Sequence, residues 1–445
     1  GEACMTVIDR RGFLVRSGLA LSAALLSREA LPLLRASALE PVTSPDWQGV
    51  RDQFRLSPEL IHLAGFFLAS HPTPVREAIE RHRAGLDADP IGYWFAHEKK
   101  QEAAVLQAAA VYLGVDPTEI ALTDSTTMGL GLLYGSLSLS PGQEILTTTH
   151  DHYSTETSLR LKAERTGATV RRIPLYEDLR HVTPEGLVET LIKAVGPRTR
   201  IVAITWVHSS TGLKLPVAEM ARAIQKVNAS RTASDRVIMC VDGVHALGVE
   251  DFRLSEVGCD FLIAGTHKWM FGPRGTGLVW GHPRAWPVAN AIIPTFDSDA
   301  YDMWMKVIPP KALPPAVYMT PGGFHSFEHR WALDQAFLFH QALGKSRVTK
   351  RIQDLNDQLK QGLAAMRRIT LHTPLSHDLS AGIVCFEVAG MSPEQVVTEL
   401  RRKRIVASVT PYATQYARMA PGLLNSEAEI EIVLKEIRAL AGSPS

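Results

Sequence analysis

The 445-residue sequence lacks an apolar stretch of the roughly 20 residues that a helix needs to cross a bilayer, and its longest candidate covers residues 18–27. It also lacks a surplus of charge, because 47 Lys and Arg residues stand against 46 Asp and Glu residues. No dense basic run is interleaved with aromatic residues, so we expect neither nucleic-acid binding nor stable membrane association. A small-molecule partner fits this composition.

Cysteine is scarce, with four residues in the chain, and no Cys-x-x-Cys or Cys/His spacing is typical of a metal site. Cys240, Cys259 and Cys385 lie in or beside apolar, strand-like runs. We therefore expect buried free thiols rather than disulfides, and no metal.

The N-terminus carries the features of an export signal. A twin-arginine pair in DRRGFLV (9–15) precedes the apolar stretch at 18–27, and Ala36-Ser37-Ala38 matches a cleavage site. We predict a twin-arginine signal peptide over 1–38, with 1–4 a vector-derived remnant, and a periplasmic protein exported by the twin-arginine machinery. This route carries folded cargo, which suits a protein that acquires a cofactor in the cytosol. The alternative is an amphipathic helix with a chance arginine pair.

Strand-like and helical patterns alternate between residues 74 and 285, which predicts an α/β protein with a mainly parallel sheet covered on both faces. The predicted strands are 119–123, 144–149, 169–175, 200–207, 236–242 and 261–265. Beyond residue 330, a long helical stretch and fewer strands suit a smaller α+β domain. We predict an N-terminal arm of the small domain over 39–73, a large domain over 74–330 and a small domain over 331–445.

Polar residues follow each predicted strand, at the sheet edge where ligands bind in open α/β sheets. Small hydroxyl residues at a helix start favour a phosphate, although such residues are more often plain helix caps. A lysine after a buried strand needs a partner or a chemical use. A phosphate site, a buried carboxylate, histidines and a desolvated lysine together predict pyridoxal 5'-phosphate (PLP) as the cofactor. The residues concerned are Ser125, Thr126, Thr127, His150, His208, Asp242, His245, His267 and Lys268.

Two motifs, GTHKWMFGPRGTG (265–277) and VDGVHALG (241–248), resemble the class V aminotransferase family of fold-type I PLP enzymes, in its isopenicillin N epimerase-like and cysteine desulfurase-like branch. The resemblance extends to HPTPVREAIERH (71–82) and ARMAPGLLNSEAEIE (417–431). It implies a homodimer and a site that forms between two subunits.

The resemblance also implies a role for each site residue, and it implies that catalysis depends on Lys268, Asp242 and His150. Lys268 would form the Schiff base with PLP and shuttle the proton, Asp242 would pair with the pyridine nitrogen, and His150 would stack on the ring. Arg418 would bind a substrate carboxylate, with a surface arginine as the alternative. The remaining cofactor contacts would be His208 and His245 to the ring oxygen, and Ser125, Thr126, Thr127 and His267 to the phosphate.

The sequence departs from the family pattern at two places. Gly265 stands where many relatives have a phosphate-binding serine, and Thr266 is a candidate substitute. Gly322-Gly323 stands near a Gly-Thr pair that in relatives reaches the neighbouring subunit's phosphate.

The sequence constrains the type of reaction less tightly than it constrains the cofactor. No cysteine occurs in RIVASVTPYATQ (404–415), so a desulfurase with a loop cysteine is not expected. An exported class V protein resembles the periplasmic enzymes that mature the siderophore pyoverdine by modifying its glutamyl side chain, by transamination or by oxidative conversion to succinamide. The alternatives are a C–S lyase or epimerase acting on a small amino acid derivative, and a non-catalytic binding protein of the same fold.

Overall fold

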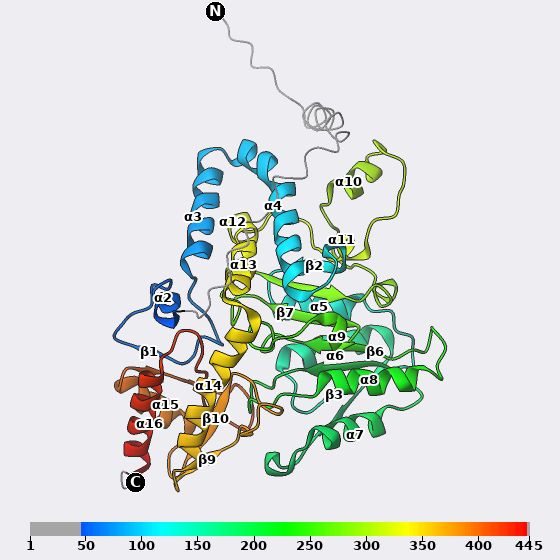
Figure 1. The fold of residues 1–445 in the computed structure, drawn as a ribbon. Coiled ribbons are helices and arrows are strands. Elements are labelled where there is room, and N and C mark those ends of the chain that lie inside the picture. Colours follow the sequence, from blue (N-terminus) through cyan, green and yellow to red (C-terminus); the bar gives the residue numbers. More distant parts are fainter. Residues whose placement is uncertain (1–45, 443–445) are drawn as a thin grey trace, which may run out of the picture. The chain divides into compact units, whose positions relative to one another are not determined.

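The computed structural model describes residues 46–442 (Figure 1). The predicted signal peptide and the first residues of the predicted arm lie outside the described range. Within that range, no helix is long and apolar enough to cross a membrane, and no group of three or more His, Cys, Asp or Glu side chains is arranged to hold a metal ion.

A seven-stranded sheet forms the centre of the large domain, in the order β2-β8-β7-β6-β5-β3-β4. Every strand is parallel to its neighbours except β8, which pairs antiparallel with β2 and β7. All six predicted runs form strands, whereas β8 was not predicted. The strands are β2 (Ile120–Thr123), β3 (Glu144–Thr148), β4 (Thr169–Ile173), β5 (Thr199–Thr205), β6 (Ile238–Asp242), β7 (Phe261–Gly265) and β8 (Gly277–Gly281).

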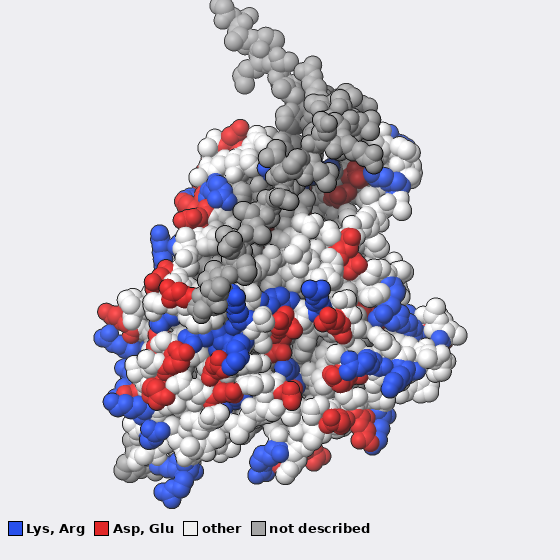
Figure 2. Space-filling model, viewed as in Figure 1, with Lys and Arg blue, Asp and Glu red and all other residues white. Residues whose placement is uncertain are grey.

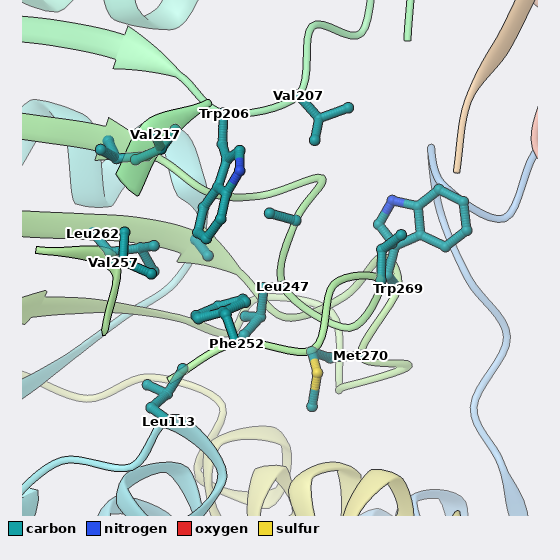
Figure 3. Close-up of a cluster of buried hydrophobic side chains, with 14 of the residues drawn as sticks. Leu113, Trp206, Val207, Val217, Leu247, Phe252, Val257, Leu262, Trp269 and Met270 are labelled. Atoms are coloured by element: carbon teal, nitrogen blue, oxygen red, sulfur yellow. The ribbon is translucent and has the colours of Figure 1, made fainter. Parts of the chain in front are cut away.

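Alternate residues of the central strands enter two separate hydrophobic clusters, which explains why these strands read as continuous apolar runs. In β5, Val202 and Ile204 belong to the larger cluster, while Ile201 and Ala203 belong to the other. Figure 3 shows part of the larger cluster, where Trp206 and Phe252 face Leu262. The main helices of this domain are α3 (Thr73–Ala88), α4 (Pro90–Leu113), α5 (Thr126–Ser136), α6 (Tyr153–Thr166), α7 (Pro184–Ala194), α8 (Val217–Asn228) and α9 (Leu254–Val257).

A long connection joins β8 to the small domain. It contains three short helices, α10 (Ser298–Trp304), α11 (Pro315–Met319) and α12 (Phe327–Trp331). The long helix expected beyond residue 330 is divided in two, because Gly344 adopts φ = 84° and interrupts the helical backbone. The two parts are α13 (Leu333–Leu343) and α14 (Lys345–Ala364).

The small domain contains a four-stranded antiparallel sheet in the order β12-β13-β10-β9 and a separate two-stranded pair, β1-β11. The apolar, strand-like run at 404–409 is divided between them, because β11 pairs with β1 and β12 pairs with β13. The elements are β1 (Ile61–His62), β9 (Ile369–Leu371), β10 (Val384–Val388), α15 (Pro393–Arg402), β11 (Ile405–Val406), β12 (Ser408–Val409), β13 (Ala417–Met419) and α16 (Glu427–Gly442).

Charged side chains of both signs are interspersed on the face of the molecule shown in Figure 2. This mixed surface agrees with the near-zero net charge of the sequence. It offers no extended basic surface on that face for a polyanion.

Candidate active site

Four neighbouring strands end where the site was predicted. β3, β5, β6 and β7 are adjacent and parallel, so their carboxyl ends lie along one edge of the sheet. His150, His208 and Lys268 follow β3, β5 and β7, and Asp242 ends β6. The topology therefore gathers residues that are far apart in the sequence.

Lys268 lies in the short loop between β7 and β8, and its Nζ is 3.4 Å from Nε2 of His245. Burial lowers the pKa of Lys268 to about 8; the negative charge of Asp242 opposes this shift and the positive charge of Arg418 adds to it. A larger share of the amine is therefore neutral near physiological pH than for an exposed lysine. A neutral amine is the form that attacks a carbonyl group.

The tautomer of His245 follows from its contact with Trp269. The indole Nε1–H of Trp269 donates to Nδ1 of His245 at 3.2 Å, and an indole nitrogen can only donate. Burial, together with the positive charges of Lys268 and Arg418, holds the pKa of His245 well below its usual range, so the ring is neutral. Its proton therefore sits on Nε2, which faces Lys268.

Asp242 is the last residue of β6 and is buried, with 3% of its surface exposed. Its Oδ1 accepts a hydrogen bond from the backbone N–H of Val244 at 3.1 Å. Burial raises the pKa of Asp242 to about 6, although the hydrogen bond from Val244 and the charge of Lys268 oppose the shift. A buried carboxylate of this kind stabilises a cationic ring nitrogen placed against it.

Two buried histidine nitrogens in this region lack a hydrogen-bond partner among the described residues. They are Nε2 of His208 and Nδ1 of His267, and His208 is fully buried. Buried polar atoms without partners are unusual and point to a missing ligand. The ring oxygen and the phosphate of PLP would supply partners of the right kind, so the residues present fit the predicted cofactor.

The predicted phosphate residues begin α5, an 11-residue helix. Ser125 caps it, its Oγ accepting from the N–H of Met128 at 3.1 Å, and the Thr127 hydroxyl lies 2.9 Å from that of Ser154. The helix start provides backbone N–H groups and a partial positive charge, which suit a phosphate.

Thr126 accounts for the glycine at position 265. Its Oγ1 accepts from the backbone N–H of Gly265 at 2.8 Å, and a Cβ added to Gly265 would lie 2.8 Å from the same oxygen. A serine would therefore collide with Thr126. Thr266, the candidate substitute, is fully buried, and its hydroxyl lies 2.5 Å from that of Thr276. The Thr266 hydroxyl is thus engaged with Thr276, and its contact with the phosphate stays a prediction.

The ring of His150 is engaged with other residues, and its stacking on PLP stays a prediction. One face lies against Tyr176, with ring centroids 4.0 Å apart and an interplanar angle of 5°, and His208 stacks at 5.6 Å. Its Nε2 accepts from the backbone N–H of Leu175 at 3.2 Å. His150 therefore holds the loop after β4 in place.

His152 is the histidine of this turn whose pKa is affected by the charge of the reactive lysine. Its pKa is lowered by burial and by the charges of Lys268 and Arg418, and its Nδ1 accepts from the N–H of Ser154 as the cap of α6. The sequence analysis missed His152, because histidine is not among the residues preferred as helix caps. Asp151, buried between the two histidines, fixes the turn by accepting from the hydroxyls of Thr148 and Thr205.

Arg418 lies on β13 and reaches the site from the small domain. It is buried, with 3% of its surface exposed, which excludes the surface alternative. Its Nε donates to Ser408 Oγ and its Nη1 to the carbonyl oxygen of Ser209, both at 2.9 Å, and Phe66 lies under the guanidinium at 4.6 Å. No carboxylate among the described residues pairs with it. Sequence analysis missed both Phe66 and Tyr412, which also contacts Ser209.

The three cysteines of the described range, Cys240, Cys259 and Cys385, are buried and free, and burial raises the pKa of each thiol. In the part of the chain that the structure describes, no thiol is therefore exposed to a substrate.

The glycine pair Gly322-Gly323 lies in the connection before α12. The backbone N–H of Gly322 donates to the carbonyl oxygen of Pro294 at 2.8 Å, and Gly323 has φ = 106°. Its contact with a second subunit stays a prediction.

Several known proteins are similar to this chain in sequence. Isopenicillin N epimerase of Streptomyces clavuligerus is 28% identical over 89% of this chain and 99% of its own length. A probable cysteine desulfurase of Halalkalibacterium halodurans is 27% identical over 71% of this chain and 76% of its own.

Solved structures share the fold. A lysine-to-alanine mutant of C-DES with glycine covalently linked to its PLP cofactor superposes with a TM-score of 0.77, at 23% identity, and covers 90% of this chain and 100% of that one. The complex of the cystine C–S lyase C-DES with cysteine persulfide gives 0.75 at 22% identity, over 87% and 99%.

The aminotransferase class-V sequence family matches residues 96–410, which include the α5 start, Asp242 and Lys268. The fold predicted from the sequence is confirmed by the mainly parallel sheet and by these structures. The chain belongs to the aminotransferase class-V family and is a PLP-dependent enzyme.

Proposed function

We propose that this enzyme acts on the free α-amino group of a glutamyl unit in a pyoverdine precursor, in the periplasm after twin-arginine export. The product would be a keto acid by transamination, with the amino group passed to a keto-acid acceptor. Alternatively it would be a succinamide by oxidative decarboxylation, which releases CO₂ and consumes a two-electron oxidant such as dioxygen. The buried Arg418 carries this proposal. A guanidinium with no carboxylate partner is costly in the interior, so its counter-ion has to come from the substrate.

The chain's own residues divide the work as follows. Arg418 would bind a carboxylate through its free Nη2 group and so orient the amine toward Lys268. Lys268, with its pKa lowered to about 8, would take up and release the proton at its Nζ. Asp242 would pair with the pyridine nitrogen, while His208, His245 and His267 would hold the ring oxygen and the phosphate. PLP, when bound, supplies the electron-withdrawing ring that weakens the bonds at the substrate Cα.

Support for the export part of the proposal comes from the sequence before residue 46, where a twin-arginine pair, an apolar stretch and an Ala-x-Ala site follow in order. Replacing Arg10 and Arg11 by lysine should keep the protein in the cytosol. Periplasmic recovery of this variant at the normal level would contradict the assignment.

We also propose a homodimer. Large apolar side chains are exposed on α4 and on the connection before α12, among them Ile91 at 64%, Trp304 at 75% and Phe324 at 81%. Exposed apolar side chains of this size mark interaction surfaces when they are contiguous. Sedimentation of the purified protein at micromolar concentration should give twice the chain mass, and a monomer would contradict the proposal.

A C–S lyase or an epimerase acting on a small amino acid derivative is the alternative. The relatives include an isopenicillin N epimerase, and one similar structure is that of a cystine C–S lyase. The burial of Cys240, Cys259 and Cys385 favours a lyase over a desulfurase that needs an enzyme thiol. Both alternatives would use the same lysine and the same arginine.

The visible absorption spectrum distinguishes these functions. The PLP-loaded enzyme is mixed with a pyoverdine precursor bearing a free glutamyl amine and, separately, with free glutamate and cystine. We expect a spectral change and a product of altered mass with the precursor alone. A response to cystine with release of a sulfur product would instead establish the lyase, and a response to none of them would refute the siderophore proposal.

A further inference from the structure

Tyr412 lies in the loop between β12 and β13, and its side chain turns toward the active site. The residues beside it, Pro411 and 413–415, are exposed, whereas Tyr412 is partly buried. Its hydroxyl oxygen lies 2.7 Å from Oγ of Ser209, a residue of the large domain. The loop thus directs one aromatic side chain inward while its tip faces solvent.

Ser209 is a common anchor for Tyr412 and Arg418. Its carbonyl oxygen accepts from Nη1 of Arg418 at 2.9 Å, and its hydroxyl bonds Tyr412. The phenol and the guanidinium are therefore both within hydrogen-bond distance of one residue. The charge of Arg418 also acts on the phenol, and the ring of His152 lies edge-on to the Tyr412 ring at 6.1 Å.

The chemistry of the pair suits a carboxylate. Burial raises the pKa of Tyr412 to about 12, so the phenol keeps its proton and acts as a donor. Arg418 also has only donors to offer, and its Nη2 has no acceptor among the described residues. A carboxylate can accept hydrogen bonds from both groups. The NH₂ group of a carboxamide is itself a donor, so it would face the phenol or the guanidinium without forming a hydrogen bond.

We propose that Tyr412 is a specificity-determining residue, whose hydroxyl, held by Ser209, donates to the substrate carboxylate that Arg418 binds. The inference rests on the proposed function, since it assumes that Arg418 binds a substrate carboxylate. The substrate class is then an amino compound with a free carboxylate near its amine. Compounds amidated at that carboxyl group are rejected.

The test compares two probes on the PLP-loaded enzyme, γ-glutamyl-tyramide and its α-carboxamide, both with a free α-amine. Dissociation constants come from the visible spectrum. We expect the wild type to prefer the carboxylate probe by about 100-fold, and Tyr412→Phe and Ser209→Ala to reduce that preference by about tenfold, which is the value of one hydrogen bond to a charged group. Tyr416→Phe, which removes a hydroxyl from the same loop without touching Ser209, is the matched control.

The outcomes separate the proposed role of Tyr412 from the proposed carboxylate site at Arg418. A loss of preference in Tyr412→Phe but not in Tyr416→Phe supports the role of Tyr412. An equal weakening of both probes would show a structural role and overturn it, as would an unchanged preference. A wild type that binds neither probe, or both equally, would overturn the proposed carboxylate site at Arg418 itself.

Discussion

The two halves of the active site are built differently. On the large domain, Asp242, His245 and Thr126 follow the edge of a buried sheet and are held by hydrogen bonds to backbone or side chains of the same domain. On the small domain, Arg418 and Tyr412 come from short strands and a loop with an exposed tip, and both depend on Ser209 across the domain boundary. The sheet edge is the cofactor half of the site and is preorganised for PLP. We propose that the small-domain half, the substrate half, is completed by the carboxylate of a substrate.

Removal of the Lys268 amine should abolish the function of the cofactor half of the site. We expect Lys268→Ala, and also Lys268→Arg, which keeps the positive charge, to lower kcat by about 10³-fold or more. The visible absorption band of lysine-bound PLP should be absent from both variants. A normal band in either variant would remove Lys268 from its role. The exposed Lys403→Ala serves as control.

Loss of the guanidinium should disable the substrate half while sparing the cofactor half. Arg418→Lys keeps the charge but not the planar fork, so we expect substrate affinity to fall by about 10- to 100-fold with normal PLP binding. Titration of substrate against the visible spectrum measures this. Arg404→Lys, at an exposed arginine of the same domain, should change nothing. An Arg418→Lys enzyme with unchanged affinity would show that the carboxylate binds elsewhere.

The protonation of Lys268 should make the reaction of the apoprotein with PLP depend on pH. Since its pKa is lowered to about 8, the amine is protonated and unreactive below that pH and neutral above it. The rate of PLP capture by the apoprotein should therefore rise by about tenfold per pH unit up to pH 8 and then level off. Stopped-flow absorbance follows the reaction. A rate still rising steeply at pH 10 would indicate an unperturbed lysine.

His150 and His152, the two histidines after β3, are expected to show the smallest effects. His150→Phe should lower the free energy of unfolding by about 1–2 kcal/mol, because the backbone N–H of Leu175 loses its acceptor, with little change in kcat. His152→Phe should instead impair turnover, because the charge of Lys268 acts on His152 and the His152 ring lies edge-on to that of Tyr412. Chemical denaturation and steady-state kinetics on both variants check this. The reverse pattern would support the predicted stacking role of His150.

Those histidines also show which features of the site could not be predicted from the sequence. The strand before them and the helix after them follow from periodicity, and so does the gathering of Asp242 and Lys268 at one sheet edge. Which histidine faces the site depends on the turn that Asp151 fixes through hydrogen bonds to threonines of β3 and β5. Such contacts between distant segments leave no periodic signal.

Other differences have similar causes. The run at 404–409 has the pattern of one strand, but Ala407 separates two strands whose partners lie in different sheets. β8 is a short apolar run bounded by glycines and could have been predicted from that pattern. Tyr412 could not, because an isolated aromatic residue in a loop has no periodicity, and its contact with Ser209 joins two domains.

The pairing of β1 with β11 also sets an order for biosynthesis. The backbone N–H groups of Ile61 and Leu63 donate to the carbonyl oxygens of Arg404 and Val406, so a segment synthesised early has to wait for one synthesised much later. A chain truncated before β11 would expose the β1 backbone and would lack Arg418 as well. Completion of this strand pair therefore requires a chain synthesised at least as far as Val406, so the fold of the first described residues depends on residues more distant in sequence than any in the central sheet.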